Sequence, residues 1–186
     1  MQKSPINVYL EAAMMAVVAV VVSFIPIQGV GFDIALGAIP MTLIALRRGL
    51  KAGLFSGLLW GVLTIILGGA SIIHPMQLFL DYPVAFFFNG FAGLVAPAFQ
   101  KASLSGNTKR AGFLIIMSTL IGTTARYFWH YITGVYYWGQ FAPEGWSVRF
   151  YSFVFNGGSV IVTTIVAGLV LLLLYRQSKQ LFEVKN

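Results

Sequence analysis

The chain alternates between long apolar stretches and short polar segments, and this pattern predicts its fold class. A membrane-spanning helix needs about 20 mostly apolar residues. Six stretches meet or approach that length: 8–26, 30–46, 51–69, 77–99, 111–136 and 150–175. The pattern therefore predicts an all-α integral membrane protein in which a single domain, residues 1–186, forms a bundle of six transmembrane helices.

The stretch 30–46 has the weakest helical pattern of the six. Glycine and proline disfavour a helix interior, and an acidic residue is costly in lipid. The residues of these types that interrupt or flank this stretch are Pro26, Gly29, Gly31, Asp33, Gly37 and Pro40. We expect the segment to be short, bent or partly re-entrant.

The positions of lysine and arginine predict how the helices are oriented, because short cytoplasmic loops are enriched in both. If six helices alternate in direction, most basic residues fall on one side: Lys3, Arg47, Arg48, Lys51, Lys101, Lys109, Arg110, Arg176, Lys179 and Lys185. The opposite side has no basic cluster and carries Asp33, His74, Glu144 and Arg149. We expect a multi-pass protein of the cell membrane with both termini in the cytoplasm.

Composition agrees with a membrane protein, since the chain is 58% hydrophobic and 9% charged, with a mean hydropathy of +0.83. The net charge of +7 comes from basic residues between apolar runs, which favours membrane topology over nucleic-acid binding. The lack of cysteine excludes disulfides and thiolate-ligated zinc. The first apolar run, from Val8 to Ile25, exceeds a signal-peptide core and is expected to be retained.

Polar and aromatic residues gather in the outer half of the predicted bundle. They come from three of the predicted helices, and are Asp81, Tyr82, Arg126, His130, Gly134, Tyr151 and Asn156. Ionisable residues inside a membrane are costly and mark functional sites. Their convergence at one depth predicts a pocket for a small, flat, cationic ligand that enters from outside the cell.

Asp81 lies in an otherwise apolar context, where a carboxylate needs a cationic partner or several hydrogen-bond donors. One interpretation is an ion pair with Arg126, which lies at a similar depth. The other is that Asp81 accepts hydrogen bonds from amino or ring N–H groups of a ligand, or balances a ligand cation. The two interpretations are compatible if Arg126 keeps Asp81 ionised.

His130 and Gly134 share one helix face with either Tyr137 or Trp138, because the spacings are four and then three or four residues. Gly134 would let a flat group approach the backbone closely. His130 and Trp138 could then stack on ligand rings. The alternative is an aromatic belt at the outer interface, which we prefer for three other residues: Trp129, Tyr136 and Trp146.

Tyr151 and Asn156 are five residues apart, so on an ideal helix they share a face only if Tyr151 precedes the helix. The amide of Asn156 needs partners in lipid, and helix–helix hydrogen bonding is an alternative to ligand binding. Trp60 lies in the middle of the stretch 51–69 and is expected in the core on sequence grounds.

Small residues repeat every four positions in two of the predicted helices. Gly53, Gly57 and Gly61 form such a stripe, and we expect it to serve internal helix packing. Ala12 and Ala16 have the same spacing in the first helix. They serve either internal packing or docking of a partner subunit.

Catalytic and nucleotide-binding motifs are missing from the sequence. It contains no G-x-S-x-G, H-E-x-x-H or G-x-x-x-x-G-K-[ST] pattern and only two histidines, so we expect no enzyme, metal site or cofactor. Energy for any transport would come from elsewhere, or none would be needed. Two alternatives stay open: a transporter for another cationic or aromatic solute without ATPases, and a membrane enzyme using His130 and Asp81.

Four motifs carry a resemblance to a known family: IPMTLIALRRGLKAGLFSGLLWG, HPMQLFLDY, RYFWHYITGVYYWGQFAPEGW and YSFVFNG. With them, the chain resembles the thiamine-specific substrate-binding component (S component) of energy-coupling factor (ECF) vitamin transporters. The resemblance implies six helices with thiamine bound near the outer face, under the first external loop. The implied ligand contacts are Asp81, His130, Gly134, Trp138, Tyr151 and Asn156, with Trp60, Tyr82 and Gln77 as weaker additions. Some relatives have a tyrosine where this chain has Ser71.

The same resemblance implies partners in the membrane. Small residues of the first helix, here Ala12 and Ala16, would dock onto a transmembrane coupling (T) component that is driven by two ATPase subunits. Thiamine would then cross as the loaded S component reorients in the bilayer, without chemistry on the vitamin.

Overall fold

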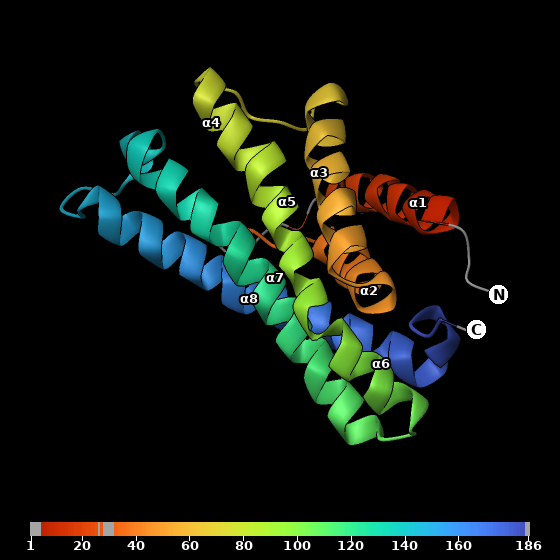
Figure 1. Ribbon diagram of the computed structural model, residues 1–186. Coiled ribbons are helices and arrows are strands. Elements are labelled where there is room, and N and C mark those ends of the chain that lie inside the picture. Colours follow the sequence, from red (N-terminus) through yellow and green to blue (C-terminus); the bar gives the residue numbers. More distant parts are fainter. Residues whose placement is uncertain (1–4, 26, 28–31, 185–186) are drawn as a thin grey trace.

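The structure is a computed structural model, and it describes residues 5–25, 27 and 32–184. Within these ranges, all regular secondary structure is helical (Figure 1). Several residues used in the sequence analysis lie outside the described ranges: Lys3, Pro26, Gly29, Gly31 and Lys185.

The helices follow the predicted order, with differences of a few residues at most ends. Their bounds are α1 (Pro5–Ser23), α2 (Ala38–Arg48), α3 (Leu50–Ile66), α4 (Pro75–Phe79), η1 (Leu80–Val84), α5 (Ala85–Asn89), η2 (Gly90–Val95), α6 (Ala96–Leu104), α7 (Thr108–Tyr136), η3 (Gly139–Phe141), α8 (Val148–Gln177) and η4 (Lys179–Leu181). The elements from α4 to α6 form one continuous helical segment that corresponds to the predicted stretch 77–99. The all-α fold with six principal helical segments is therefore confirmed.

Four helical segments are long and apolar enough to cross a membrane: Ile6–Ser23, Pro75–Leu104, Thr108–Tyr136 and Val148–Gln177. The apolar helix α3 is somewhat shorter, at 17 residues. Large apolar side chains remain exposed along α1 and α8, for example Leu10, Val17 and Leu169. Such surfaces need lipid or protein around them, so the protein is an integral membrane protein.

The second predicted helix is much shorter than the stretch 30–46 suggested. Helix α2 begins only at Ala38 and has 11 residues, a length of about 16 Å that cannot cross a hydrocarbon core of about 30 Å. Pro40 fits in its first turn, where no intrahelical donor is needed. Most residues of α2 are buried among other helices, so protein rather than lipid surrounds this short element.

The glycine stripe of α3 packs internally, as the sequence predicted. A Cβ atom added at Gly57 would lie 2.1 Å from the backbone oxygen of Phe86, and one at Gly61 would lie 2.4 Å from that of Tyr82. The stripe therefore lets the backbone of α3 lie directly against η1 and α5. This contact fixes the segment that carries Asp81.

The small residues of α1 also pack internally. Ala12 and Ala16 have no exposed surface, and the hydroxyl of Ser56 on α3 donates a hydrogen bond to the carbonyl oxygen of Ala12 (2.7 Å). They are thus inaccessible to a partner in this structure, which contradicts the prediction of a docking face formed by these two alanines. The exposed face of α1 consists of larger apolar residues, among them Leu10, Met14, Val17 and Val21.

Next to Ala12 on α1, Glu11 joins this helix to α2. Its carboxylate accepts hydrogen bonds from Arg47 (Nε–Oε2, 3.1 Å) and Arg48. Arg47 also donates to backbone carbonyls of the C-terminal segment, such as that of Gln180 (2.8 Å). The basic pair at the end of α2 therefore connects α1, α2 and the chain's C-terminal turn.

The contact between α3 and α5 can be tested by a pair of matched substitutions. We expect Gly57→Ala to lower the free energy of unfolding by about 1–3 kcal/mol, because the new methyl group meets backbone that cannot move aside. Gly157→Ala on α8 meets no atom within 4 Å and should be neutral or slightly stabilising. Thermal unfolding in detergent measures both, and equal melting temperatures would contradict the packing described here.

Candidate functional site

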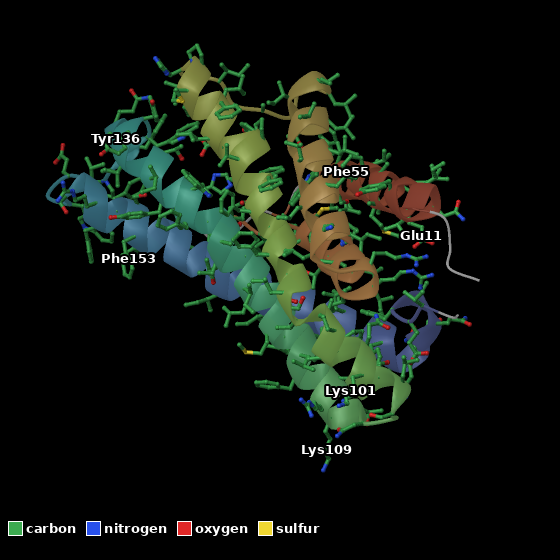
Figure 2. The ribbon with its side chains drawn as sticks, in the orientation of Figure 1. Glu11, Phe55, Lys101, Lys109, Tyr136 and Phe153 are labelled. Carbon is green, nitrogen blue, oxygen red and sulfur yellow. The ribbon has the colours of Figure 1, made fainter. Side chains whose placement is uncertain are left out.

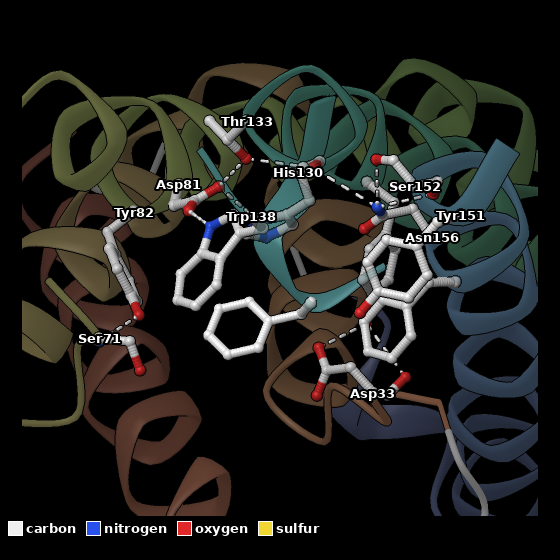
Figure 3. Close-up of a pocket in the computed structure, with 14 residues that line it drawn as sticks. Asp33, Ser71, Asp81, Tyr82, His130, Thr133, Trp138, Tyr151, Ser152 and Asn156 are labelled. Atoms are coloured by element: carbon white, nitrogen blue, oxygen red, sulfur yellow. Dashed lines mark hydrogen bonds and ion pairs between the residues drawn. The ribbon is translucent and has the colours of Figure 1, made fainter. Parts of the chain in front are cut away.

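A cavity of about 480 Å³ lies between η1, the C-terminal half of α7, the N-terminal half of α8, and residues 32–37 (Figure 3). Its lining combines two carboxylates with aromatic and hydroxyl side chains: Asp33, Ser71, Asp81, Tyr82, Tyr127, His130, Thr133, Gly134, Trp138, Phe141, Tyr151, Ser152, Phe155 and Asn156. Most of the predicted ligand contacts therefore meet at one cavity.

Asp81 lies on a π-helical turn, η1, which interrupts an otherwise continuous helical segment. Pro83 within this turn has no N–H to donate, so a regular α-helical bond is missing there. Such π-bulges are frequent at functional sites because they reorient a side chain within a helix. The turn places the carboxylate of Asp81 at the cavity, where only 4% of the residue's surface is exposed.

Four side chains donate hydrogen bonds to the Asp81 carboxylate, or share one with it. The Oδ1 atom is bonded to His130 (Nδ1, 2.9 Å) and Thr133, and the Oδ2 atom to Gln77 (Nε2, 2.7 Å) and Trp138 (Nε1, 3.1 Å). Figure 3 shows the indole of Trp138 and the hydroxyl of Thr133 converging on the carboxylate. Each oxygen thus has two partners, so the carboxylate is fully hydrogen-bonded.

This arrangement decides between the interpretations of Asp81. Each oxygen of this carboxylate already takes part in two hydrogen bonds, so neither has a lone pair left for a ligand N–H. The carboxylate nevertheless keeps its negative charge at the cavity wall. It can therefore balance a ligand cation without losing a protein donor. The predicted ion pair between Asp81 and Arg126 is wrong, because Arg126 pairs with Asp33 (Nη2–Oδ2, 3.7 Å).

Arg126 is held among aromatic rings below the cavity. Its guanidinium carbon lies 4.5 Å from the ring centroid of Phe86, 4.9 Å from that of Tyr127 and 5.2 Å from that of Trp60. The rings offer their electron-rich faces to the cation, which compensates part of the cost of burying it. Trp60 itself is 1% exposed and does not line the cavity, so it supports the site from beneath instead of contacting a ligand.

Asp33 brings a second carboxylate to the cavity, which the sequence analysis placed outside the membrane but not in the site. The phenol of Tyr127 donates to its Oδ2 atom (2.8 Å). The backbone N–H of Asp33 donates to the hydroxyl of Ser159 on α8 (3.0 Å). These bonds fasten residues 32–37 to α7 and α8, so this segment forms a wall of the cavity.

His130 presents one ring nitrogen to the site. Because Nδ1 faces the Asp81 carboxylate, a neutral ring carries its proton there, and Nε2 is then an acceptor. The Nε2 atom is buried and has no hydrogen-bond partner among the described residues. It is therefore a polar atom beside the cavity whose hydrogen-bonding capacity no described group uses.

Gly134 lines the cavity, but its missing side chain also serves helix packing. A Cβ atom there would lie 2.2 Å from the hydroxyl oxygen of Ser152. The hydroxyl of Ser152 donates to the carbonyl oxygen of Tyr131 (2.9 Å) and so joins α8 to α7. The space left by the missing side chain of Gly134 is therefore used for the contact with α8 as well as by the cavity.

Tyr151 and Asn156 both line the cavity, although Tyr151 lies within α8 and not before it. Their five-residue spacing places them on two sides of α8, as the sequence indicated, and the cavity borders both sides of its first turns. The Asn156 amide nitrogen donates to the carbonyl oxygen of Ser152 (2.9 Å). Asn156 therefore both forms a hydrogen bond within α8 and lines the cavity.

The weaker candidates Tyr82 and Gln77 take different positions. Tyr82 lines the cavity, and its hydroxyl accepts a hydrogen bond from the backbone N–H of Ser71 (2.7 Å). Gln77 has no exposed surface and does not line the cavity, but it bonds Asp81, the Ser71 carbonyl (3.1 Å) and the Ile73 N–H (2.9 Å). Gln77 is thus a positioning residue that ties the loop before α4 to the central carboxylate.

Sequence reasoning did not select several lining residues: Asp33, Tyr127, Thr133, Phe141, Ser152 and Phe155. Thr133 had a signal, since it follows His130 by three residues and so lies on the same helix face. The aromatic-belt residues Trp129, Tyr136 and Trp146 do not line the cavity. Tyr136 is 77% exposed, whereas Trp129 packs against Phe88 at a ring-centroid distance of 5.3 Å.

The fold and the cavity define a class: a helical integral membrane protein with a polar, aromatic-lined ligand site near one end of the bundle. The family model of the thiamine transporter protein (Thia_YuaJ) matches residues 9–183, and the chain belongs to this family. It is a transport protein family, in agreement with the prediction that the chain is not an enzyme.

Individual relatives cover nearly the whole chain. It is 38% identical over 190 residues to the thiamine transporter ThiT of Lacticaseibacillus paracasei, covering all of this chain and 94% of that protein. It is 36% identical to ThiT of Bacillus subtilis over 82% of this chain and 80% of that protein. The solved structure of ThiT from Listeria monocytogenes superposes with a TM-score of 0.94 at 40% identity, covering 98% of this chain and all of that one.

The positioning role of Gln77 generates a prediction for the ligand-free protein. We expect Gln77→Leu to lower the free energy of unfolding by about 1–3 kcal/mol, because it removes a donor to the buried Asp81 carboxylate and the partners of two loop groups. Met76→Leu, an exposed neighbour on the same helix, is the control. Thermal unfolding compares the two, and a melting temperature of Gln77→Leu equal to that of the control would refute the role.

Proposed function

We propose that this protein binds thiamine from the outer side of the cell membrane and takes it up as the S component of an ECF-type transporter. The observation that carries the proposal is the Asp81 carboxylate, saturated by protein donors and facing a cavity lined by an indole and an imidazole. Membership of the thiamine transporter family supports the choice of ligand.

The chemistry of thiamine fits the side chains of the cavity. Its thiazolium ring carries a permanent positive charge, which Asp81 balances and over which the indole of Trp138 can stack. A cation over an aromatic face gains about 0.5–2 kcal/mol, depending on desolvation. The aminopyrimidine amine donates to Nε2 of His130, and Tyr151 and Asn156 provide polar groups on the opposite wall.

The orientation in the membrane follows from charge. Basic residues gather at the end of the bundle away from the cavity, in the connection from α2 to α3, in the connection from α6 to α7 and after α8. The positive-inside rule places that end, and both termini, in the cytoplasm. The cavity then opens toward the outside, as capture of an external vitamin requires.

Uptake as an ECF-type S component involves partners that bind ATP, and this sequence carries no nucleotide-binding loop of its own. We infer that a transmembrane coupling (T) component and two ATPase subunits supply the energy. Since Ala12 and Ala16 are buried, the contact surface we assign to the coupling component is the exposed apolar face of α1, around Leu10, Met14 and Val17. This face is separate from the cavity lining.

Two substitutions test the ligand site. We expect Asp81→Asn and Trp138→Ala each to weaken thiamine binding by at least about tenfold, which corresponds to about 1.4 kcal/mol. The first removes the negative charge and the second the stacking surface. Isothermal titration with thiamine measures both against Glu144→Gln and Tyr136→Phe, which change similar groups outside the cavity. Normal affinity in both site variants would place the ligand elsewhere.

The proposed docking face has its own test. We expect the double variant Leu10→Trp and Val17→Trp to abolish co-purification with the ATPase module and thiamine uptake, while thiamine affinity stays within about twofold. The control places the same bulk on the exposed face of α8, at Leu169 and Leu173. Equal co-purification of the α1 variant and the control would reject this face but leave thiamine binding untouched.

A further inference from the structure

A second hollow lies at the opposite end of the molecule from the thiamine cavity, where α7 begins and α8 ends. It has a volume of about 410 Å³ and is lined from both helices and from η4. Figure 2 shows Lys109 at this end of α7, far from Tyr136 at the other end. We call this hollow the basic groove.

Three cationic side chains line the basic groove: Lys109, Arg176 and Lys179. None of its lining residues is acidic, and among the described residues no carboxylate lies within 4.0 Å of these three cations. The ammonium nitrogen of Lys179 lies 5.6 Å from the ring centroid of Tyr175, a buried residue of the groove wall. The groove therefore concentrates positive charge that no described side chain neutralises.

The other half of the groove is apolar. The boundary between its apolar and cationic halves lies at the same level on α7 and α8. On α7, Phe113 is 63% exposed and lies one turn beyond Lys109. On α8, Leu172 lies one turn before Arg176. Each helix face thus passes from an apolar side chain to a cation within one turn, as at the boundary between hydrocarbon and lipid headgroups.

Gly112 provides the space between the two helices in the apolar half. A Cβ atom added there would meet only the side chain of Leu172, at 3.3 Å. A large side chain at this position would therefore take up space in the groove beside Leu172. The groove is open on one side and is not a closed internal cavity.

We propose that the basic groove binds one anionic phospholipid of the inner leaflet. Its phosphate lies among Lys109, Arg176 and Lys179, and the start of an acyl chain lies along Phe113 and Leu172 past Gly112. Basic pockets between transmembrane helices on the cytoplasmic side are typical sites for anionic headgroups. The groove holds the cytoplasmic ends of α7 and α8 at headgroup depth, and it is separate from thiamine binding because none of its residues lines that cavity.

The test uses native mass spectrometry of the full-length, delipidated protein with phosphatidylglycerol, with zwitterionic phosphatidylcholine and with water-soluble glycerol 1-phosphate. We expect one phosphatidylglycerol to bind at least tenfold more tightly than phosphatidylcholine. The triple variant Lys109→Gln, Arg176→Gln and Lys179→Gln should lose at least tenfold of this affinity. Gly112→Leu should also weaken phosphatidylglycerol binding at least threefold, because it fills the chain slot and leaves the charges unchanged.

The matched control removes three cations from the same end of the molecule that do not line the groove, through Lys51→Gln, Lys101→Gln and Arg110→Gln. It should keep phosphatidylglycerol binding within about twofold. Thiamine binding, which these variants should not change, shows that each one is folded. An equal loss in the control, equal binding of both lipids, or equal affinity for glycerol 1-phosphate and phosphatidylglycerol would each overturn the proposal. Gly112→Leu decides by itself if the triple variant does not fold.

Discussion

The structure depends on keeping one carboxylate charged inside a membrane. Removing a carboxylate from water costs several kcal/mol unless donors replace the lost hydration. Here Gln77, His130, Thr133 and Trp138 replace it, two to each oxygen of Asp81. Because these donors are all neutral side chains apart from the titratable imidazole, they stabilise the charge without cancelling it. The cavity wall can therefore remain negative, a property that suits a ligand whose positive charge is permanent.

The rest of the bundle keeps this arrangement in place. The π-turn η1 directs Asp81 inward, and the glycine stripe of α3 lets that turn lie against backbone instead of side chains. Helix α7 supplies four lining residues, Tyr127, His130, Thr133 and Gly134, and α8 fastens to it through Ser152. Arg126 neutralises part of the second carboxylate, Asp33, so the two acidic residues of the cavity have different surroundings. The site thus has one carboxylate, Asp81, that is bonded to His130 and has no arginine or lysine partner, and one, Asp33, that pairs with Arg126.

Sequence patterns predicted the helices well because lipid restricts a chain to long apolar helices with satisfied backbones. They also identified half of the residues that line the cavity, since a polar side chain in an apolar helix is conspicuous. The pairing of charges was not predictable, because Arg126 lies at a depth from which either Asp81 or Asp33 could be reached. The sequence left packing and docking open for Ala12 and Ala16, because small residues mark close contact without showing whether the neighbour is the same chain or another. Helix α2 is short, as expected from the glycines and prolines of the stretch 30–46, and its burial among other helices removes the need to span the bilayer.

The most direct measurement compares thiamine with a neutral analogue in which a thiophene ring replaces the thiazolium. Isothermal titration of the unaltered protein and of Asp81→Asn with both ligands isolates the interaction between the carboxylate and the ligand charge. If Asp81 balances the cation, thiamine should bind the unaltered protein at least about tenfold more tightly than the analogue, and Asp81→Asn should reduce this preference to about twofold or less. A preference that stays the same in Asp81→Asn would contradict the account, because the carboxylate would then not sense the charge of the ligand.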